Sequence, residues 1–249
     1  MKAFTLFGRL MKHFFRSAEA IVTAVIQPVA LMLLFVYVFG GSIKMSLGGN
    51  VNYVNYQLPG ILLMTVGYGI TYTAQRLYND RQRGIMARFN TMPIPRSSIL
   101  WGHVLTSLVS TLISLVIVFF AALIIGFRPS ASIIEWSMIA GILMLFTLAL
   151  TWVAVIPGLV AKTTEGATAL AFPVIFLPFL SSAFTPTEMM PAPLRVFAGN
   201  QPITSIVETL RALINSEPTG NEIWIALAWC VGIMLVAWFF AMRIYRRRT

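Results

Sequence analysis

Side chains able to do covalent or metal chemistry are few and widely spaced in this sequence. Its 249 residues include two histidines (His13 and His103), one cysteine (Cys230) and eight acidic residues. A lone cysteine excludes an internal disulfide and a multi-thiolate metal site. The chain also has no GxxxxGK(S/T) phosphate-binding loop, no HExxH zinc motif and no GxSxG nucleophile motif. The sequence therefore predicts no catalytic, cofactor or metal site, and a protein that is not an enzyme.

The most informative charged segment is the connection 76–98, which reads RLYNDRQRGIMARFNTMPIPRSS. Its first half can continue a preceding helix, with Gly84 as a weak point, and its two later prolines end any helix. Between these points, apolar side chains lie among arginines. One interpretation is a solvated basic loop. The other is a short helix that docks on a cytoplasmic partner, with its apolar side chains in a groove and its arginines making polar contacts.

Composition indicates what surrounds these segments. The chain is 58% hydrophobic and 10% charged, whereas soluble domains have about 25% charged residues. A bilayer core of roughly 30 Å needs about 20 apolar residues in a helix. Six runs meet or approach this length: 20–40, 58–75, 99–126, 133–160, 167–184 and 223–243. The sequence predicts an all-α integral membrane protein with six transmembrane helices in a single transmembrane domain, 1–249. The second and fifth runs contain prolines, which disfavours straight, full spans.

The basic residues predict the orientation of these helices. Of the 18 Lys and Arg residues, all but Lys44, Arg128, Arg195 and Arg211 fall on one side of the six runs. Cytoplasmic loops carry such an excess, so both termini are predicted in the cytoplasm. The net charge of +10 is then explained by topology and lipid headgroups, without nucleic acid. Residues 1–19 have a basic and an apolar face, which predicts an amphipathic helix lying in the membrane interface.

The connection 185–222 is the longest segment predicted outside. Its first part is rich in proline, so no uniform helix can run through it. After Pro202, apolar residues recur at helical spacing, namely Ile203, Ile206, Val207, Leu210, Leu213 and Ile214. Glu208 and Arg211 lie on the polar side of this stripe. A broken segment that re-enters the membrane before the last span, 223–243, is therefore predicted.

These features together resemble the permease subunits of the ABC type-2 transporter family, most closely the daunorubicin-resistance-type drug and lipid exporters. The resemblance covers nearly the whole chain, in the expected order. Its residues are Tyr53-Val-Asn-Tyr56, Leu58-Pro-Gly-Ile61, Arg83-Gly-Ile-Met-Ala-Arg-Phe89, Met92-Pro-Ile-Pro-Arg96, Leu100-Trp-Gly-His103, Ala161-Lys-Thr-Thr-Glu-Gly166, Phe176-Leu-Pro178, Ser181-Ser-Ala-Phe184 and Asn200-Gln-Pro202 with Arg211.

The resemblance implies a mechanism and a set of partners. Two permeases, identical or paralogous, would pair in a bacterial cytoplasmic membrane, and each would engage a separate ATPase subunit that holds ATP and Mg. The coupling loop would comprise Arg81, Arg83, Gly84, Ile85, Met86, Arg88 and Phe89. The exit region would comprise Phe184, Glu188, Asn200, Pro202, Glu208 and Arg211.

The lack of charged residues within the predicted spans indicates the class of cargo, and two other functions are considered beside the exporter. Because no predicted span carries a charge near its middle, the expected cargo is hydrophobic or amphipathic: a drug, a lipid or a glycolipid. An ATP-independent secondary transporter and a membrane-embedded lipid-modifying enzyme are the alternatives. The first would require transport driven by an ion gradient, and the second would require catalytic side chains gathered in a cavity.

Overall fold

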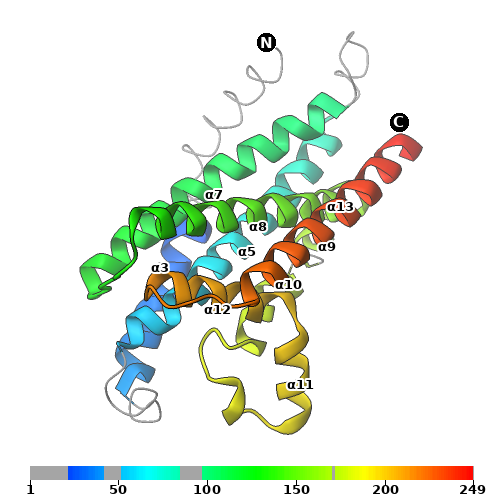
Figure 1. Ribbon diagram of the computed structural model, residues 1–249. Coiled ribbons are helices and arrows are strands. Elements are labelled where there is room, and N and C mark those ends of the chain that lie inside the picture. The colour runs from blue at the N-terminus through cyan, green and yellow to red at the C-terminus, as the bar shows by residue number, and fades with distance from the viewer. Residues whose placement is uncertain (1–21, 42–51, 85–96, 170–171, 249) are drawn as a thin grey trace.

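A computed structural model describes residues 22–41, 52–84, 97–169 and 172–248 of the chain (Figure 1). Over these ranges the regular structure is helical, without strands. The predicted interfacial helix 1–19 and the coupling-loop residues Ile85, Met86, Arg88 and Phe89 lie outside the described residues. The observed helices confirm the predicted all-α class.

Helix α5 (Tyr53–Gln82) is the central helix, in contact with α3, α7, α8, α9, α10 and α12. The side chain of Asn52 caps its start by accepting a hydrogen bond from the Val54 amide at 3.1 Å. The helix then continues through Pro59, within its second turn. Most of its residues are buried on all sides by other helices, so it can include polar residues such as Gln57 and Thr65 that a lipid-facing helix would exclude. The predicted run 58–75 is therefore one continuous and longer helix.

Among the described residues, three helices are long and apolar enough to cross a membrane, namely α7 (Ser97–Ile125), α8 (Ile133–Val160) and α13 (Glu222–Arg248). They match the third, fourth and sixth predicted runs. A capping box begins α8, in which the Ser132 amide donates to Glu135 Oε2 at 2.6 Å and the Glu135 amide donates to Ser132 Oγ at 3.4 Å. The chain is accordingly a multi-pass membrane protein, and the number of six spans stays a prediction.

The first and fifth predicted runs form shorter helical pieces. The first consists of η1 (Val22–Ile26), α3 (Gln27–Leu34) and η2 (Phe35–Phe39), of which η1 and η2 are π-helical. The fifth consists of α9 (Thr164–Ala169), α10 (Phe172–Phe176) and the 3-10 helix η3 (Leu177–Leu180). Its two prolines remove backbone donors and restrict the preceding residues, which accounts for the change of helix type.

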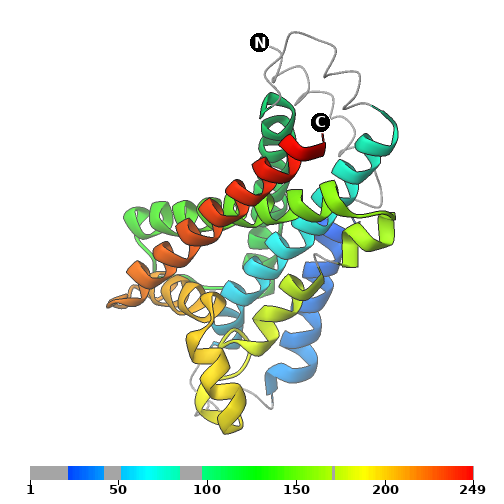
Figure 2. The same ribbon diagram turned by 90° about the vertical axis from the view of Figure 1, so that its right-hand side faces the viewer.

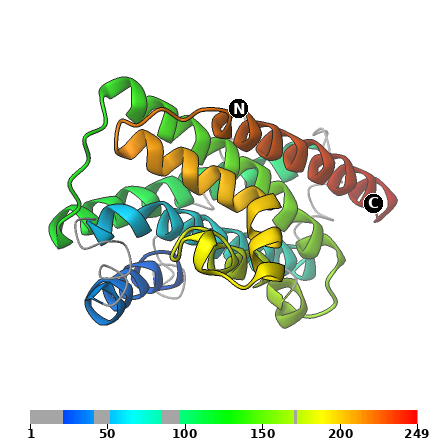
Figure 3. The same ribbon diagram turned by 60° about the horizontal axis from the view of Figure 1, so that its bottom comes forward.

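The predicted external segment also contains helices. These are η4 (Thr187–Met189), α11 (Ala192–Asn200) and α12 (Pro202–Ile214). All six residues of the predicted apolar stripe in α12 are buried, where α12 lies against α5, α8 and α13 (Figure 3). Burial of this stripe, rather than helix propensity alone, holds α12 in place. The depth of α12 in a membrane remains a prediction.

The ends of the long helices gather at two opposite ends of the molecule. The end of α5, the start of α7 and the end of α13 lie together at the top of Figures 1 and 2, whereas α11 lies at the bottom. The predicted topology requires this alternation, because it assigns the connection 76–98 and the C-terminal tail to one side. Which end faces the cytoplasm is a prediction from the basic residues.

Close helix approaches depend on small and hydroxyl-bearing residues. A Cβ atom on Gly60 of α5 would lie 2.6 Å from Ala183 Cβ, so only glycine fits there. Farther along α5, the Thr73 and Ser107 hydroxyls are 2.7 Å apart, and the Thr151 hydroxyl donates to Ser107 Oγ at 3.3 Å. These contacts join α5, α7 and α8 through buried hydrogen bonds from which water is excluded.

Candidate functional site

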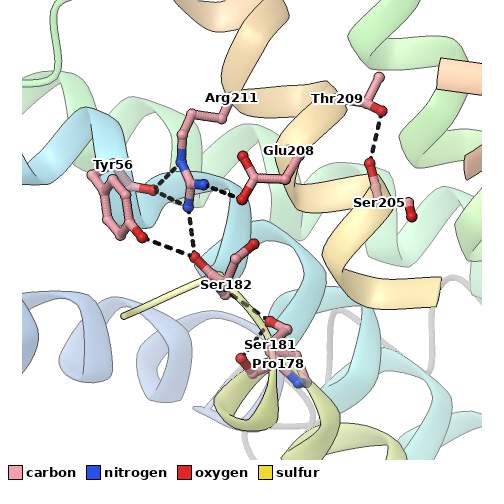
Figure 4. A network of polar contacts seen from close by, with 9 residues as sticks. Tyr56, Pro178, Ser181, Ser182, Ser205, Glu208, Thr209 and Arg211 are labelled. Carbon is pink, nitrogen blue, oxygen red and sulfur yellow. Dashed lines mark hydrogen bonds and ion pairs between the residues drawn. The ribbon is translucent and has the colours of Figure 1, made fainter. Parts of the chain in front are cut away.

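Arg211 is the centre of a polar cluster at the end of the molecule where α5 begins (Figure 4). On α12, its Nη1 donates to Glu208 Oε1 at 2.8 Å, and the two residues are one helical turn apart. Its Nη2 donates to the Ser182 carbonyl, also at 2.8 Å. Arg211 therefore joins α12 to the chain that follows η3.

Tyr56 of α5 is the third side of this cluster. The Arg211 guanidinium carbon lies 3.9 Å from the centre of the Tyr56 ring, a cation–π contact. Arg211 Nε and Nη2 also donate to the Tyr56 carbonyl at 3.4 and 3.3 Å. The Tyr56 hydroxyl in turn donates to the Ser182 carbonyl at 3.2 Å. We call Tyr56, Ser182, Glu208 and Arg211 the Arg211 cluster.

Local turns place the Ser182 carbonyl where it accepts these bonds. The Ser181 hydroxyl donates to the Pro178 carbonyl at 2.6 Å and accepts from the Ala183 amide at 3.1 Å, which closes a tight turn after η3. Gln201, at the start of α12, donates its side-chain amide to the Leu180 carbonyl. The break in the fifth predicted run therefore provides a carbonyl that a regular helix would use internally.

The Arg211 charge is fully engaged by this geometry. Its side chain is 13% exposed, and it is compensated by one carboxylate, two carbonyl groups and an aromatic face. Because its donors are used within the chain, the cluster is a clamp between three segments and not an open anion site.

Phe184 lies close to the cluster in sequence but belongs to an aromatic group. Its ring is buried, stacks on Phe35 with a centroid distance of 4.4 Å, and lies 5.2 Å from the ring of Phe179. It thus joins η2 to the segment after η3. Nearby rings extend this group to a surface where Phe39, Phe172 and Phe176 are about half exposed. The arrangement offers an apolar, aromatic surface beside the polar clamp.

The other three predicted exit residues do not join the cluster. Glu188 lies in η4, where its backbone carbonyl accepts from Arg195 Nη2 at 2.7 Å. The side chain of Asn200 is exposed at the end of α11 and donates to the Val196 carbonyl at 2.8 Å. Pro202 starts α12. The structure therefore brings together Glu208 and Arg211, with Phe184 next to them.

At the opposite end of α5, Arg81 is bonded to the end of α8. Its guanidinium donates to the carbonyls of Leu159 and Ala161, and lies 5.3 Å from the ring centre of Tyr78. The Tyr78 hydroxyl donates to the Lys162 carbonyl at 2.8 Å. The donors of Arg81 thus satisfy carbonyls that the end of a helix leaves without partners. We call these five residues the Arg81 junction.

The remaining described residues of the predicted coupling loop are free of such contacts. Arg83 is exposed just after α5 ends, and Gly84 has φ of +67°, a conformation that disfavours other residues. The prediction that helix α5 continues into the connection and weakens at Gly84 is confirmed. The role of this loop in coupling remains a prediction.

Arg76 corrects one element of the sequence interpretation. It was expected in a basic connection, yet it lies within α5, where its side chain is buried and donates to the His103 carbonyl of α7 at 3.1 Å. His103 Nε2 lies 3.5 Å from Asp80 Oδ2. Tyr72, Arg76 and Asp80 are spaced four apart, so helical periodicity places them on one face of α5. That spacing was the available signal for this polar contact between α5 and α7.

Tyr56 and Ser182 were also missed as site residues. Both accept hydrogen bonds from Arg211 through their backbone carbonyls, and residue type gives little information about such roles. Within the described part of the chain, no three His, Cys, Asp or Glu side chains are grouped so that they could hold a metal ion. The contacts of the Arg211 cluster hold three segments of the chain together.

Comparison with known proteins shows which family the sequence matches. The model of the ABC-2 type transporter family matches residues 1–215. The chain is similar to a daunorubicin resistance ABC transporter permease protein of Streptomyces coeruleorubidus, with 27% identity over 244 residues, covering 97% of this chain and 84% of that protein.

Other relatives cover similar shares. A doxorubicin resistance ABC transporter permease protein of Mycobacterium tuberculosis is 23% identical over 235 residues, which cover 92% of this chain and 82% of that protein. The ycf38 transport permease of Pyropia yezoensis is 28% identical over 245 residues, which cover 93% of this chain and 81% of that protein. Each match spans both the Arg211 cluster and the Arg81 junction at these coverages.

Proposed function

The chain belongs to the ABC-2 type transporter family, and we propose that it is the permease subunit of an exporter driven by a separate ATPase subunit. In this proposal two permeases pair in the bacterial cytoplasmic membrane, and ATP with Mg binds only to the ATPase subunits. The end of the molecule that carries the Arg81 junction faces the cytoplasm. The cargo is a hydrophobic or amphipathic molecule, such as a drug, a lipid or a glycolipid.

The observation that carries the proposal is the connectivity of α5. This helix has 30 residues, about 45 Å at 1.5 Å per residue. Its last turn is bonded to α8 at the Arg81 junction, and its first turn carries Tyr56 of the Arg211 cluster. A movement of the connection 76–98 would therefore reach the far end of the molecule through one stiff, buried element.

The cargo class is supported by the surfaces at that far end. The exposed rings of Phe39, Phe172 and Phe176 lie beside the Arg211 cluster, in which the charges of Arg211 and Glu208 are paired with each other. Such surfaces favour apolar and aromatic molecules over ions. Two curated relatives carry daunorubicin or doxorubicin resistance in their names, which makes an aromatic drug the first cargo to test.

The experiment is a reconstitution of the permease with its ATPase subunit. Replacing Arg88 and Phe89 by alanine should weaken co-purification of the ATPase, or remove the stimulation of ATP turnover by the permease. The matched control is Phe197→Ala, which removes an exposed phenylalanine of α11 at the other end of the molecule. Unchanged binding and turnover in the loop variant would contradict coupling through this loop. Transport driven by a proton gradient without the ATPase would favour a secondary transporter instead.

A further inference from the structure

A groove of about 430 Å³ lies among α5, α7 and α8, away from the Arg211 cluster, and its walls are almost entirely apolar. Val116 and Phe119 from α7, Trp136 and Ala140 from α8, and Leu62 from α5 belong to its lining. Its volume lies within the range of roughly 300–1,000 Å³ that is common for small-molecule sites. No function described above uses this groove.

The groove opens at an exposed apolar surface of the molecule. In its lining, Val116 is 52% exposed and Ala140 is also exposed. The next residues on α7, including Phe120, present further exposed apolar side chains. At one end, the ring of Phe119 stands edge-on to Trp136 with a centroid distance of 5.0 Å. An occupant would therefore enter sideways from the bilayer, and the part that enters would be apolar.

A cationic side chain lies just beyond this aromatic end. Arg128 is exposed, and its Nη1 donates to the carbonyls of Phe127 and Leu123 at 3.0 and 3.4 Å. Leu123 is one helical turn beyond Phe119, about 6 Å along α7, and Phe127 packs edge-on against Phe119. The guanidinium is thus held near the rim of the groove.

The backbone of Arg128 is fixed independently of its charge. The Asn55 side chain donates to the Arg128 carbonyl at 2.8 Å and accepts from the Arg128 amide at 3.1 Å. The nearest acidic residue along α8, Glu135, already accepts bonds from the Ser132 amide and the Ser216 hydroxyl at 2.6 and 3.0 Å. Arg128 therefore presents a positively charged group at a fixed place above an apolar groove.

We propose that this groove binds one acyl chain of a phospholipid whose phosphate lies at Arg128. The apolar walls match the chain, and the lateral opening matches delivery from the bilayer. The exposed arginine matches a phosphate at the level of the headgroups. The site is a lipid site on the outside of the α5–α7–α8 bundle, and it is distinct from the path proposed for the cargo.

The test is native mass spectrometry of the purified full chain, titrated with palmitoyl-oleoyl phosphatidylglycerol in detergent. The wild-type chain should retain one lipid. Ala140→Phe, which fills the groove, should weaken retention by at least about tenfold through lost apolar burial. Val116→Phe gives an independent blockage from α7. Ile124→Phe is the control, since it adds an aromatic ring at an 87% exposed position that does not line the groove.

The contribution of the phosphate is tested separately. Arg128→Gln should weaken phosphatidylglycerol binding by about two- to fivefold, as expected for an exposed ion pair, and Arg128→Lys should restore part of the loss. The matching diacylglycerol, which lacks a phosphate, should bind less well than phosphatidylglycerol.

Three results would overturn the assignment. Wild-type lipid retention in both folded groove variants would exclude the groove. Equal binding of diacylglycerol and phosphatidylglycerol would exclude the phosphate contact. Displacement of the lipid by daunorubicin would make the groove a cargo site. Each readout is independent of the ATPase subunit, so failure here is distinguishable from failure of the proposed exporter function.

Discussion

The guanidinium of Arg211 stacks on the ring of Tyr56 at 3.9 Å, although the two residues are 155 positions apart in the chain. The same guanidinium also bonds Glu208 and the Ser182 carbonyl. One side chain thereby connects the start of the central helix, the break in the fifth predicted run and the last helix of the external segment. A planar cation with several donors is needed to make these contacts at once.

Replacing Arg211 by lysine should therefore be costly, although the charge is kept. An ammonium group cannot stack on Tyr56 and still reach both Glu208 and Ser182. We expect a loss of about 1–3 kcal/mol of stability, the usual range for hydrogen bonds to charged groups. A lower midpoint of thermal unfolding in detergent would register this loss.

The control for that variant is Arg195→Lys. Arg195 is exposed on α11 and bonds only backbone carbonyls of its own segment among the contacts described. The Arg195→Lys substitution should therefore change the midpoint of thermal unfolding only slightly. Equal effects of the two lysine substitutions would contradict the clamp role of Arg211.

Gly60→Ala should destabilise the chain through a steric clash. The added methyl group would lie 2.6 Å from Ala183 Cβ, well inside the contact distance of about 3.5–4.0 Å between carbon atoms. Overpacking of this kind costs about 1–3 kcal/mol. Thermal unfolding of the purified variant would measure it.

Gly141→Ala provides the matched control on α8. Nothing lies within 4 Å of the position that its Cβ would occupy, and alanine in a helix interior is favoured over glycine by about 0.5–1 kcal/mol. The two glycine variants should thus shift the unfolding midpoint in opposite directions. A stabilised Gly60→Ala chain would show that α5 does not approach Ala183 as described.

Arg81→Gln should separate α5 from the end of α8 without removing the loop that follows. The variant loses the donors to the Leu159 and Ala161 carbonyls. We expect ATP turnover with little transport, a loss of about five- to tenfold in cargo moved per ATP hydrolysed, as is typical of a coupling change. Comparison with Arg83→Gln, an exposed neighbour, isolates the junction from simple loss of charge. Equal coupling in both variants would contradict a role for the Arg81 junction.

The helical elements were largely predictable from the sequence, because lipid requires long apolar runs. The boundaries 133–160 were predicted as they are found in α8, and the stripe in α12 was predicted residue by residue. The length of helix α5, in contrast, was not predicted correctly from the sequence. It is surrounded by protein, so lipid does not restrict its composition, and hydropathy alone underestimates its length.

The candidate site was predictable only where side chains pair at helical spacing. Glu208 and Arg211, three apart, were placed on the polar side of one helix from sequence, and the structure pairs them there. Ser182 escaped prediction because it contributes a carbonyl oxygen, whose position depends on a tight turn after η3 rather than on residue type. Tyr56 contributes its ring, hydroxyl and carbonyl, but its contact with Arg211 depends on how α12 packs on α5. Arg76 was assigned to the basic connection 76–98 for a related reason, since its burial depends on how α7 packs on α5.

ATP-driven accumulation of daunorubicin in inside-out membrane vesicles tests the exporter account most directly. Vesicles would contain the chain with its ATPase subunit, the chain alone, or the pair in which the permease carries Arg88→Ala and Phe89→Ala. The account predicts accumulation that needs ATP and both subunits, and that falls in the loop variant while lipid binding at Arg128 is unaffected. Equal accumulation by the chain alone, or none by the intact pair with any hydrophobic cargo tested, would contradict it.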